Sequence, residues 1–257
     1  MKDILRQLAV IVSIIATLIV NALANALPLN GLNTGQISDR FHVYFVPAGY
    51  VFSIWGVIYL GLIAFAIYQA LPSQRENSRL QATGWWISLG GLANSAWIFL
   101  WHYELFPLTL IAMLTLLATL IVTYLRLGIG QSDAPAGETW AARLPFSIYL
   151  GWITVATVAN VTDVLDYLKW DSFGIAPEIW MSIVLVAVLV ITLLMNFTRH
   201  DVAYAAVILW ALAGISFKFA DVAAVAIPTW ITFGLVALTL AVAFFIRKPT
   251  RKLGTVV

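Results

Sequence analysis

The sequence has no cysteine and few charged side chains. Only 10% of its 257 residues are Asp, Glu, Lys or Arg, whereas a soluble domain carries about 25%. The absence of Cys excludes disulfides, thiolate metal sites, cysteine nucleophiles and cysteine lipidation. The composition also excludes a disordered chain and a nucleic-acid-binding surface. Hydrophobic residues make up 62% of the chain, so polar groups are too few to cover a surface in water. The composition indicates an integral membrane protein.

Eight apolar segments are each long enough for a membrane-spanning helix, which needs about 20 residues. We predict an all-α membrane protein with eight spans, at residues 4–27, 48–71, 82–101, 106–128, 145–166, 177–197, 202–222 and 227–246. The start of the chain also has features of a cleavable signal peptide. Its apolar run is long for a signal core, which favours a span.

The positions of the basic residues support an even number of spans. Eleven of the fourteen Lys and Arg residues lie at the termini or in the second, fourth and sixth connections, and only Arg40 and Lys169 lie in connections on the other side. Cytoplasmic loops carry the excess of Lys and Arg. We therefore predict that both termini are cytoplasmic, and we expect a multi-pass protein of the bacterial cytoplasmic (inner) membrane.

Three sequence blocks carry aromatic residues in a distinctive order. They are YLGWITVATVAN at 149–160, PAGYVFSIWGVIY at 47–59, and NSAW at 94–97 followed by Pro107. Together they resemble the translocator protein/tryptophan-rich sensory protein (TspO/MBR) family, whose fifth helix typically reads Y-L-x-W-x-x-F-A-T-x-L-N. The second block departs from the family pattern, because it is one residue shorter and lacks an internal Pro. The resemblance implies a TspO-like five-helix transmembrane domain over 1–168. The last three spans depart from this five-helix core, and we predict that 169–257 is a three-helix transmembrane extension that ends in a short basic tail.

Aromatic residues recur at helical spacing in three of the segments. Spacings of three or four residues place side chains on one face of a helix. We predict that three such faces converge on one cavity, with the following candidate binding residues: Tyr50, Phe52, Trp55, Tyr59, Asn94, Trp97, Trp101, Tyr149, Trp152, Ala156 and Asn160. Buried amides are costly in hydrocarbon unless they are hydrogen-bonded, so Asn94 and Asn160 should face the bundle interior, where a structural role is as reasonable as a ligand contact.

A cavity walled by rings, with a small residue and a few polar anchors, suits a planar hydrophobic ligand such as a porphyrin or haem-like tetrapyrrole. The family resemblance implies that Trp55, Asn94, Trp152 and Ala156 are pocket positions, and it implies a sensory or transport-linked output. We expect no obligatory cofactor and no metal site. The sequence has no phosphate-binding loop or nucleophile elbow, so we do not expect an enzyme.

Charged residues of the extension leave an alternative function open. Asp201, Lys218 and Asp221 could line the pathway of a small-solute transporter, because ionisable residues inside a membrane are often functional. Lys218 could also form a Schiff base with retinal, which is the least favoured reading. The less specific interpretation is that Lys218 snorkels to the interface or pairs with Asp221 one turn away.

The third segment has small residues at helix-packing spacing, namely Gly84 with Ser88 and Gly91 with Ser95. Such pairs allow another helix to approach closely. They predict a homodimer surface on this helix, unless the extension covers it.

Overall fold

The computed structural model describes residues 2–27 and 29–246, and these contain only helices, turns and loops. The predicted basic tail lies outside the described residues. The long helices are α1 (Lys2–Ala26), α3 (Ile54–Ala70), α4 (Ser78–His102), α5 (Phe106–Arg126), α7 (Leu144–Tyr167), α8 (Pro177–Arg199), α9 (Val202–Lys218) and α10 (Ala223–Phe245). The short ones are α2 (Thr34–Ser38), α6 (Ala136–Glu138), the 3₁₀ turns η1 (Leu29–Gly31), η2 (Gly49–Ser53), η3 (Pro72–Gln74) and η5 (Ser172–Gly174), and the π turn η4 (Thr139–Arg143).

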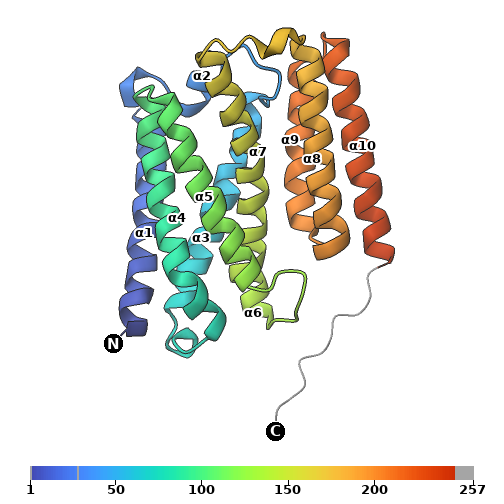
Figure 1. Cartoon of the computed structure of the whole chain (residues 1–257). Coiled ribbons are helices and arrows are strands. Elements are labelled where there is room, and N and C mark those ends of the chain that lie inside the picture. The colour runs from blue at the N-terminus through green and yellow to red at the C-terminus, as the bar shows by residue number, and fades with distance from the viewer. Residues whose placement is uncertain (1, 28, 247–257) are drawn as a thin grey trace.

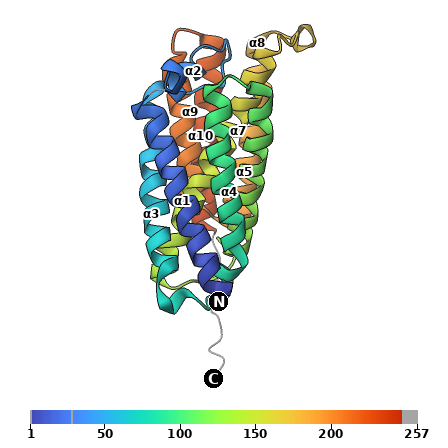
Figure 2. The same cartoon turned by 90° about the vertical axis from the view of Figure 1, so that its left-hand side faces the viewer.

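The long helices run side by side as a bundle with two parts (Figure 1). Helices α1, α4, α5, α7 and α3 pack in that order around a ring, which α1 and α3 close (Figure 2). Helix α9 packs against the outside of α7, and α8 and α10 pack against α9 and each other. The start of α1 and the end of α10 lie at the same end of the bundle, and α2 lies at the opposite end.

Six stretches are long and apolar enough to cross a bilayer, and they include α1, α5, α8 and α10. The other two are Gly49–Ala70 and Ala136–Tyr167. These findings confirm an all-helical membrane protein. Helix α9 is apolar but has only 17 residues. The count of eight spans and the side of each terminus stay predictions.

Several segments differ from their predicted bounds, and the second and the seventh bear most on the site. The second does not begin as an α-helix, because Gly49–Ser53 forms the 3₁₀ turn η2 and α3 begins at Ile54. Phe52 therefore precedes the helix on whose face we placed it. The seventh helix ends at Lys218 rather than at residue 222, and α10 begins at Ala223. The apolar residues after Asp221 explain this shift, since they extend the last helix rather than the turn.

The small residues of α4 are used inside the chain. A Cβ on Gly84 would come within 2.6 Å of the Arg6 side chain, and one on Gly91 would come within 3.0 Å of Thr17. A Cβ on Gly90 would come within 2.8 Å of the Thr119 side chain of α5. Helices α1 and α5 thus approach α4 closely at these glycines, which have no side chain, while Ser88 and Ser95 stay half-exposed and the homodimer stays a prediction.

The connection after α5 holds the five-helix ring against the extension. Gly130 has a φ of +73°, and a Cβ there would overlap the backbone carbonyl of Arg199. The next residue, Gln131, donates from Nε2 to the Thr198 carbonyl oxygen at 2.6 Å. The contact between Gly130 and Arg199 joins backbone to backbone, so neither residue can relieve a clash there by rotating a side chain.

Replacing Gly130 by Ala should therefore lower the stability of the whole bundle. A left-handed residue with a Cβ costs about 1–2 kcal/mol, and overpacking adds about 1–3 kcal/mol. Thermal unfolding in detergent should show a lower midpoint for G130A. The control is G234A in α10, where a Cβ meets nothing within 4 Å. Equal midpoints for the two variants would contradict this account of the contact.

Candidate ligand-binding site

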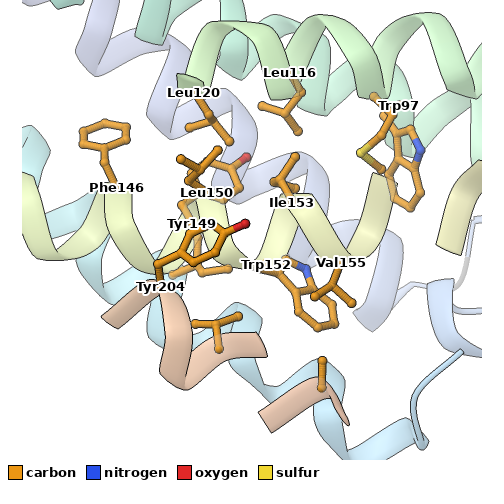
Figure 3. Close-up of a cluster of buried hydrophobic side chains, with 14 of the residues drawn as sticks. Trp97, Leu116, Leu120, Phe146, Tyr149, Leu150, Trp152, Ile153, Val155 and Tyr204 are labelled. Carbon is orange, nitrogen blue, oxygen red and sulfur yellow. The ribbon is translucent and has the colours of Figure 1, made fainter. Parts of the chain in front are cut away.

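Aromatic rings from η2, α3, α4 and α7 lie close together inside the five-helix ring. The ring centroids of Trp55 and Trp152 are 6.1 Å apart and meet edge to face, and Phe52 lies 5.7 Å from Trp152. On α4, Trp97 and Trp101 stack at 5.1 Å. Figure 3 shows Trp97 and Trp152 pointing inward among aliphatic side chains of α5 and α7. Rings from the three predicted faces thus lie near one another, and whether they bind a ligand stays a prediction.

Two adjoining cavities lie between these rings. One has a volume of about 40 Å³, the other about 30 Å³, and both are lined by Thr34, Phe52, Trp97, Trp152 and Ala156. Trp101 and Asn160 line only the first, and Trp55 and Asn94 only the second. A water occupies about 30 Å³ of liquid, whereas pockets for drug-sized ligands measure about 300–1,000 Å³. The rings enclose a real but small hollow in this state.

Three predicted site residues do not line these cavities. Tyr50 is 49% exposed and meets Trp210 of α9 edge to face at 5.4 Å. Tyr59 stacks on Trp55. Tyr149 lines a separate cavity of about 20 Å³. The three sequence blocks that resemble the family therefore contain residues that line the two cavities and residues that lie outside them.

The two buried amides are engaged in hydrogen bonds between helices. Asn94 accepts from Asn21 of α1 at 2.6 Å and donates to the Tyr149 hydroxyl of α7 at 3.0 Å. Asn160 accepts from Nε1 of Trp97 at 3.2 Å and donates to Thr109 of α5 at 2.8 Å. These bonds fix the positions of the rings. The structural role of both amides is therefore established by their contacts.

A segment that we call the cover, residues 29–53, closes the hollow at one end. Thr34 of α2 reaches both cavities, and its carbonyl accepts from Nε1 of Trp101 at 3.2 Å. Nδ1 of the buried His102 lies 3.0 Å from the Leu29 carbonyl oxygen and donates to it, since a carbonyl only accepts. That leaves Nε2 of a neutral ring to accept from the Thr34 hydroxyl at 3.1 Å. The side-chain amide of Asn30 donates from Nδ2 to the backbone carbonyl oxygen of His102 at 3.0 Å.

Neither Thr34 nor His102 was among the candidate site residues predicted from the sequence. One local signal for Thr34 was available, because Asn33 and Gln36 form a capping box around the start of α2. Nothing in the sequence places His102 beneath that helix. The two residues are brought together by packing over a separation of 68 positions.

The extension holds the other side of the cover. Lys218, the last residue of α9, pairs with Asp39 at 2.7 Å rather than with Asp221. The Ala48 amide donates to the Gly214 carbonyl at 3.3 Å. Tyr44 donates to Glu178 of α8 at 2.9 Å, and this hydrogen bond to a carboxylate raises the pKa of Tyr44. Helices α8 and α9 are thus part of the structure around the hollow.

Asp201, the other charge singled out in the extension, caps the start of α9. It accepts from the Ala203 and Tyr204 amides at 3.1 Å, from the Tyr124 hydroxyl at 2.8 Å and from the Ser147 hydroxyl at 2.6 Å. This carboxylate is one wall of a polar cavity of about 340 Å³ at the end of the bundle away from the cover. Its other walls include Arg143, Arg199 and His200.

These features define a helical membrane protein with an aromatic hollow inside a ring of five helices. A family model for TSPO-like proteins matches residues 7–245, so the chain belongs to the TSPO-like protein family. The family resemblance seen in the sequence is confirmed, and the match continues through the three C-terminal helices, beyond the range over which we saw it. The chain has no match among curated proteins or solved structures.

Removing the Asn94 amide should destabilise the ring of helices, because Asn21 and Tyr149 would each lose a partner. Hydrogen bonds between membrane helices are worth about 0.6–2 kcal/mol each, so N94A should cost about 1–2 kcal/mol. Thermal unfolding in detergent would measure the change. The matched control is N25A, since the exposed Asn25 bonds only within α1. Equal losses for both variants would mean that the inter-helix bonds contribute nothing.

Proposed function

We propose that this protein is a membrane-embedded binding protein with a sensory or transport-linked role. Its ligand is planar and hydrophobic, of the porphyrin or haem-like tetrapyrrole class, and binds among the rings of Phe52, Trp97 and Trp152. The observation that carries the proposal is the convergence of these rings, from η2, α4 and α7, on one hollow. The protein acts by binding, and we propose no catalytic role for any residue.

Ligand entry requires the cover to move. The cavities of about 40 and 30 Å³ are far smaller than a tetrapyrrole, but they share five wall residues and belong to one hollow. Two of these shared residues, Thr34 and Phe52, belong to the cover itself. Lifting the cover would join the two spaces while the rings on α4 and α7 stay in place.

The alternative of a small-solute transporter gains no support from the contacts of its proposed residues. Asp201 accepts four hydrogen bonds, and Lys218 is paired with Asp39. Asp201 does line the cavity of about 340 Å³, but its four hydrogen bonds hold it as the cap of α9, and the ion pair with Asp39 holds Lys218 in this state. A Schiff base on Lys218 would likewise need the ion pair to open.

Shortening Trp152 should weaken tetrapyrrole binding. In W152A the ring that contacts both Phe52 and Trp55 is lost, and an aromatic contact contributes about 0.5–1.5 kcal/mol beyond its buried area. We expect the Kd for protoporphyrin IX to rise about 10-fold or more, measured from the absorbance change of the porphyrin with protein in nanodiscs. The control is W140A, because Trp140 is 70% exposed and far from the hollow's wall. The same Kd in wild type and W152A would reject this site.

Loosening the cover should speed ligand association. In K218M the pair with Asp39 is lost, so the open state of the cover becomes more populated and the association rate constant should rise several-fold. The pair is partly exposed, so the effect on overall stability should be below about 1 kcal/mol. Stopped-flow mixing with protoporphyrin IX measures the rate. D221N is the control, since Asp221 is exposed and takes no part in this pair. An unchanged rate in K218M would show that the pair does not restrain the cover.

A further inference from the structure

One wall of the hollow carries a buried carboxyl group that the proposed function does not use. Asp163 of α7 lies one turn beyond Asn160 and lines the 40 Å³ cavity. Its relative exposure is 2%, and its Oδ1 has no hydrogen-bond partner among the described residues. Acidic groups inside membrane domains are costly unless they are paired, and unpaired ones usually mark a functional site. The aromatic faces predicted from the sequence did not include this residue.

The neighbouring charges do not neutralise Asp163. Lys218 makes its ion pair with Asp39 at 2.7 Å. Asp166, one turn further along α7, is a second acid, which accepts from the His42 amide at 3.1 Å. The described residues at this end of the bundle include seven carboxyl groups, of Asp39, Glu104, Asp163, Asp166, Asp171, Glu178 and Asp221, and three basic side chains, of Arg40, Lys169 and Lys218. The excess is negative, so the field there attracts a cation.

The rings beside Asp163 favour the same sign of charge. Phe52, Trp97, Trp101 and Trp152 line the cavity together with it. Ring faces carry partial negative charge and attract cations, most strongly where water is excluded. An anionic ligand group would be repelled by the carboxyl, and a neutral donor would form a weaker hydrogen bond with it than a charged donor does. A protonated amine would satisfy both the carboxyl and the rings.

We propose that this hollow recognises its ligand through a protonated amino group, which sits beside Asp163 among the rings of Trp97, Trp101 and Trp152. The cavity of about 40 Å³ holds an ammonium-sized group but little more. The apolar part of the ligand then extends along the hollow toward Trp55. This inference rests on the proposed function, because it uses the same hollow, and it narrows the planar ligand to one that bears an amine, a group that protoporphyrin IX, used above to probe the hollow, does not have.

The test compares tryptamine with its neutral isostere 3-propylindole, both by calorimetric titration of the full chain in phosphatidylcholine nanodiscs. These lipids carry no net charge, so the bilayer does not concentrate the amine. Wild type should bind tryptamine about 10-fold or more tightly than 3-propylindole, since a charged hydrogen bond and cation–π contacts act only on the amine. In D163N this preference should disappear, while 3-propylindole keeps its affinity. D166N, one turn away, should keep the preference.

Equal affinities of wild type for the two probes would overturn the amine inference, and this comparison needs no variant to fold. A preference that survives in D163N would overturn it as well. If both probes bind equally and W152A weakens both, the proposed binding function stands without the amine. If neither probe binds and protoporphyrin IX does not bind either, the proposed function fails and the amine inference fails with it.

Discussion

The structure depends on the absence of water around its interior polar groups. In hydrocarbon an amide or hydroxyl must find its partner within the protein. Asn94 therefore ties α1 to α7 through Asn21 and Tyr149, and Asn160 ties α4 to α5 through Trp97 and Thr109. Each bond joins helices that are distant in sequence. Together they set the rotation of the helices that carry the rings, so the geometry of the hollow follows from hydrogen bonds formed beside it.

The three C-terminal helices belong to the same functional unit as the five-helix ring. Helix α9 packs on α7, and its last residues contact the cover through Lys218 and Gly214. Helix α8 contributes Glu178, which binds Tyr44 of the cover. The family match through residue 245 agrees with this arrangement. Any motion of the cover must therefore change contacts with both α8 and α9, which gives ligand binding a route to the second half of the molecule.

The closed hollow has rigid walls on α4 and α7 and the cover on its remaining side. Trp97 and Trp152 are held among tightly packed aliphatic side chains (Figure 3), so the walls on α4 and α7 cannot widen easily. The cover is attached by hydrogen bonds, by the partly exposed ion pairs Lys218–Asp39 and Arg40–Glu104, and by buried side chains such as Ile37 and Val51. In the proposed function the cover is the side that opens, since it contributes Thr34 and Phe52 to both cavities. In the proposed function, selectivity comes from the groups that stay fixed, namely the rings on α4 and α7 and the carboxyl of Asp163.

The sequence by itself determined the class of the protein, its helices and the faces on which the rings lie. These are local properties, since hydropathy over about 20 residues and a 3.6-residue period depend only on neighbours in the chain. Tertiary structure alone decided that Lys218 meets Asp39 and not Asp221, that Thr34 lies over His102, and that the hollow is small. It also decided that Asp163 is left without a partner. Such features depend on the tilt and register of helices far apart in sequence, because a side chain at the end of a helix has several neighbours within reach and only packing selects among them.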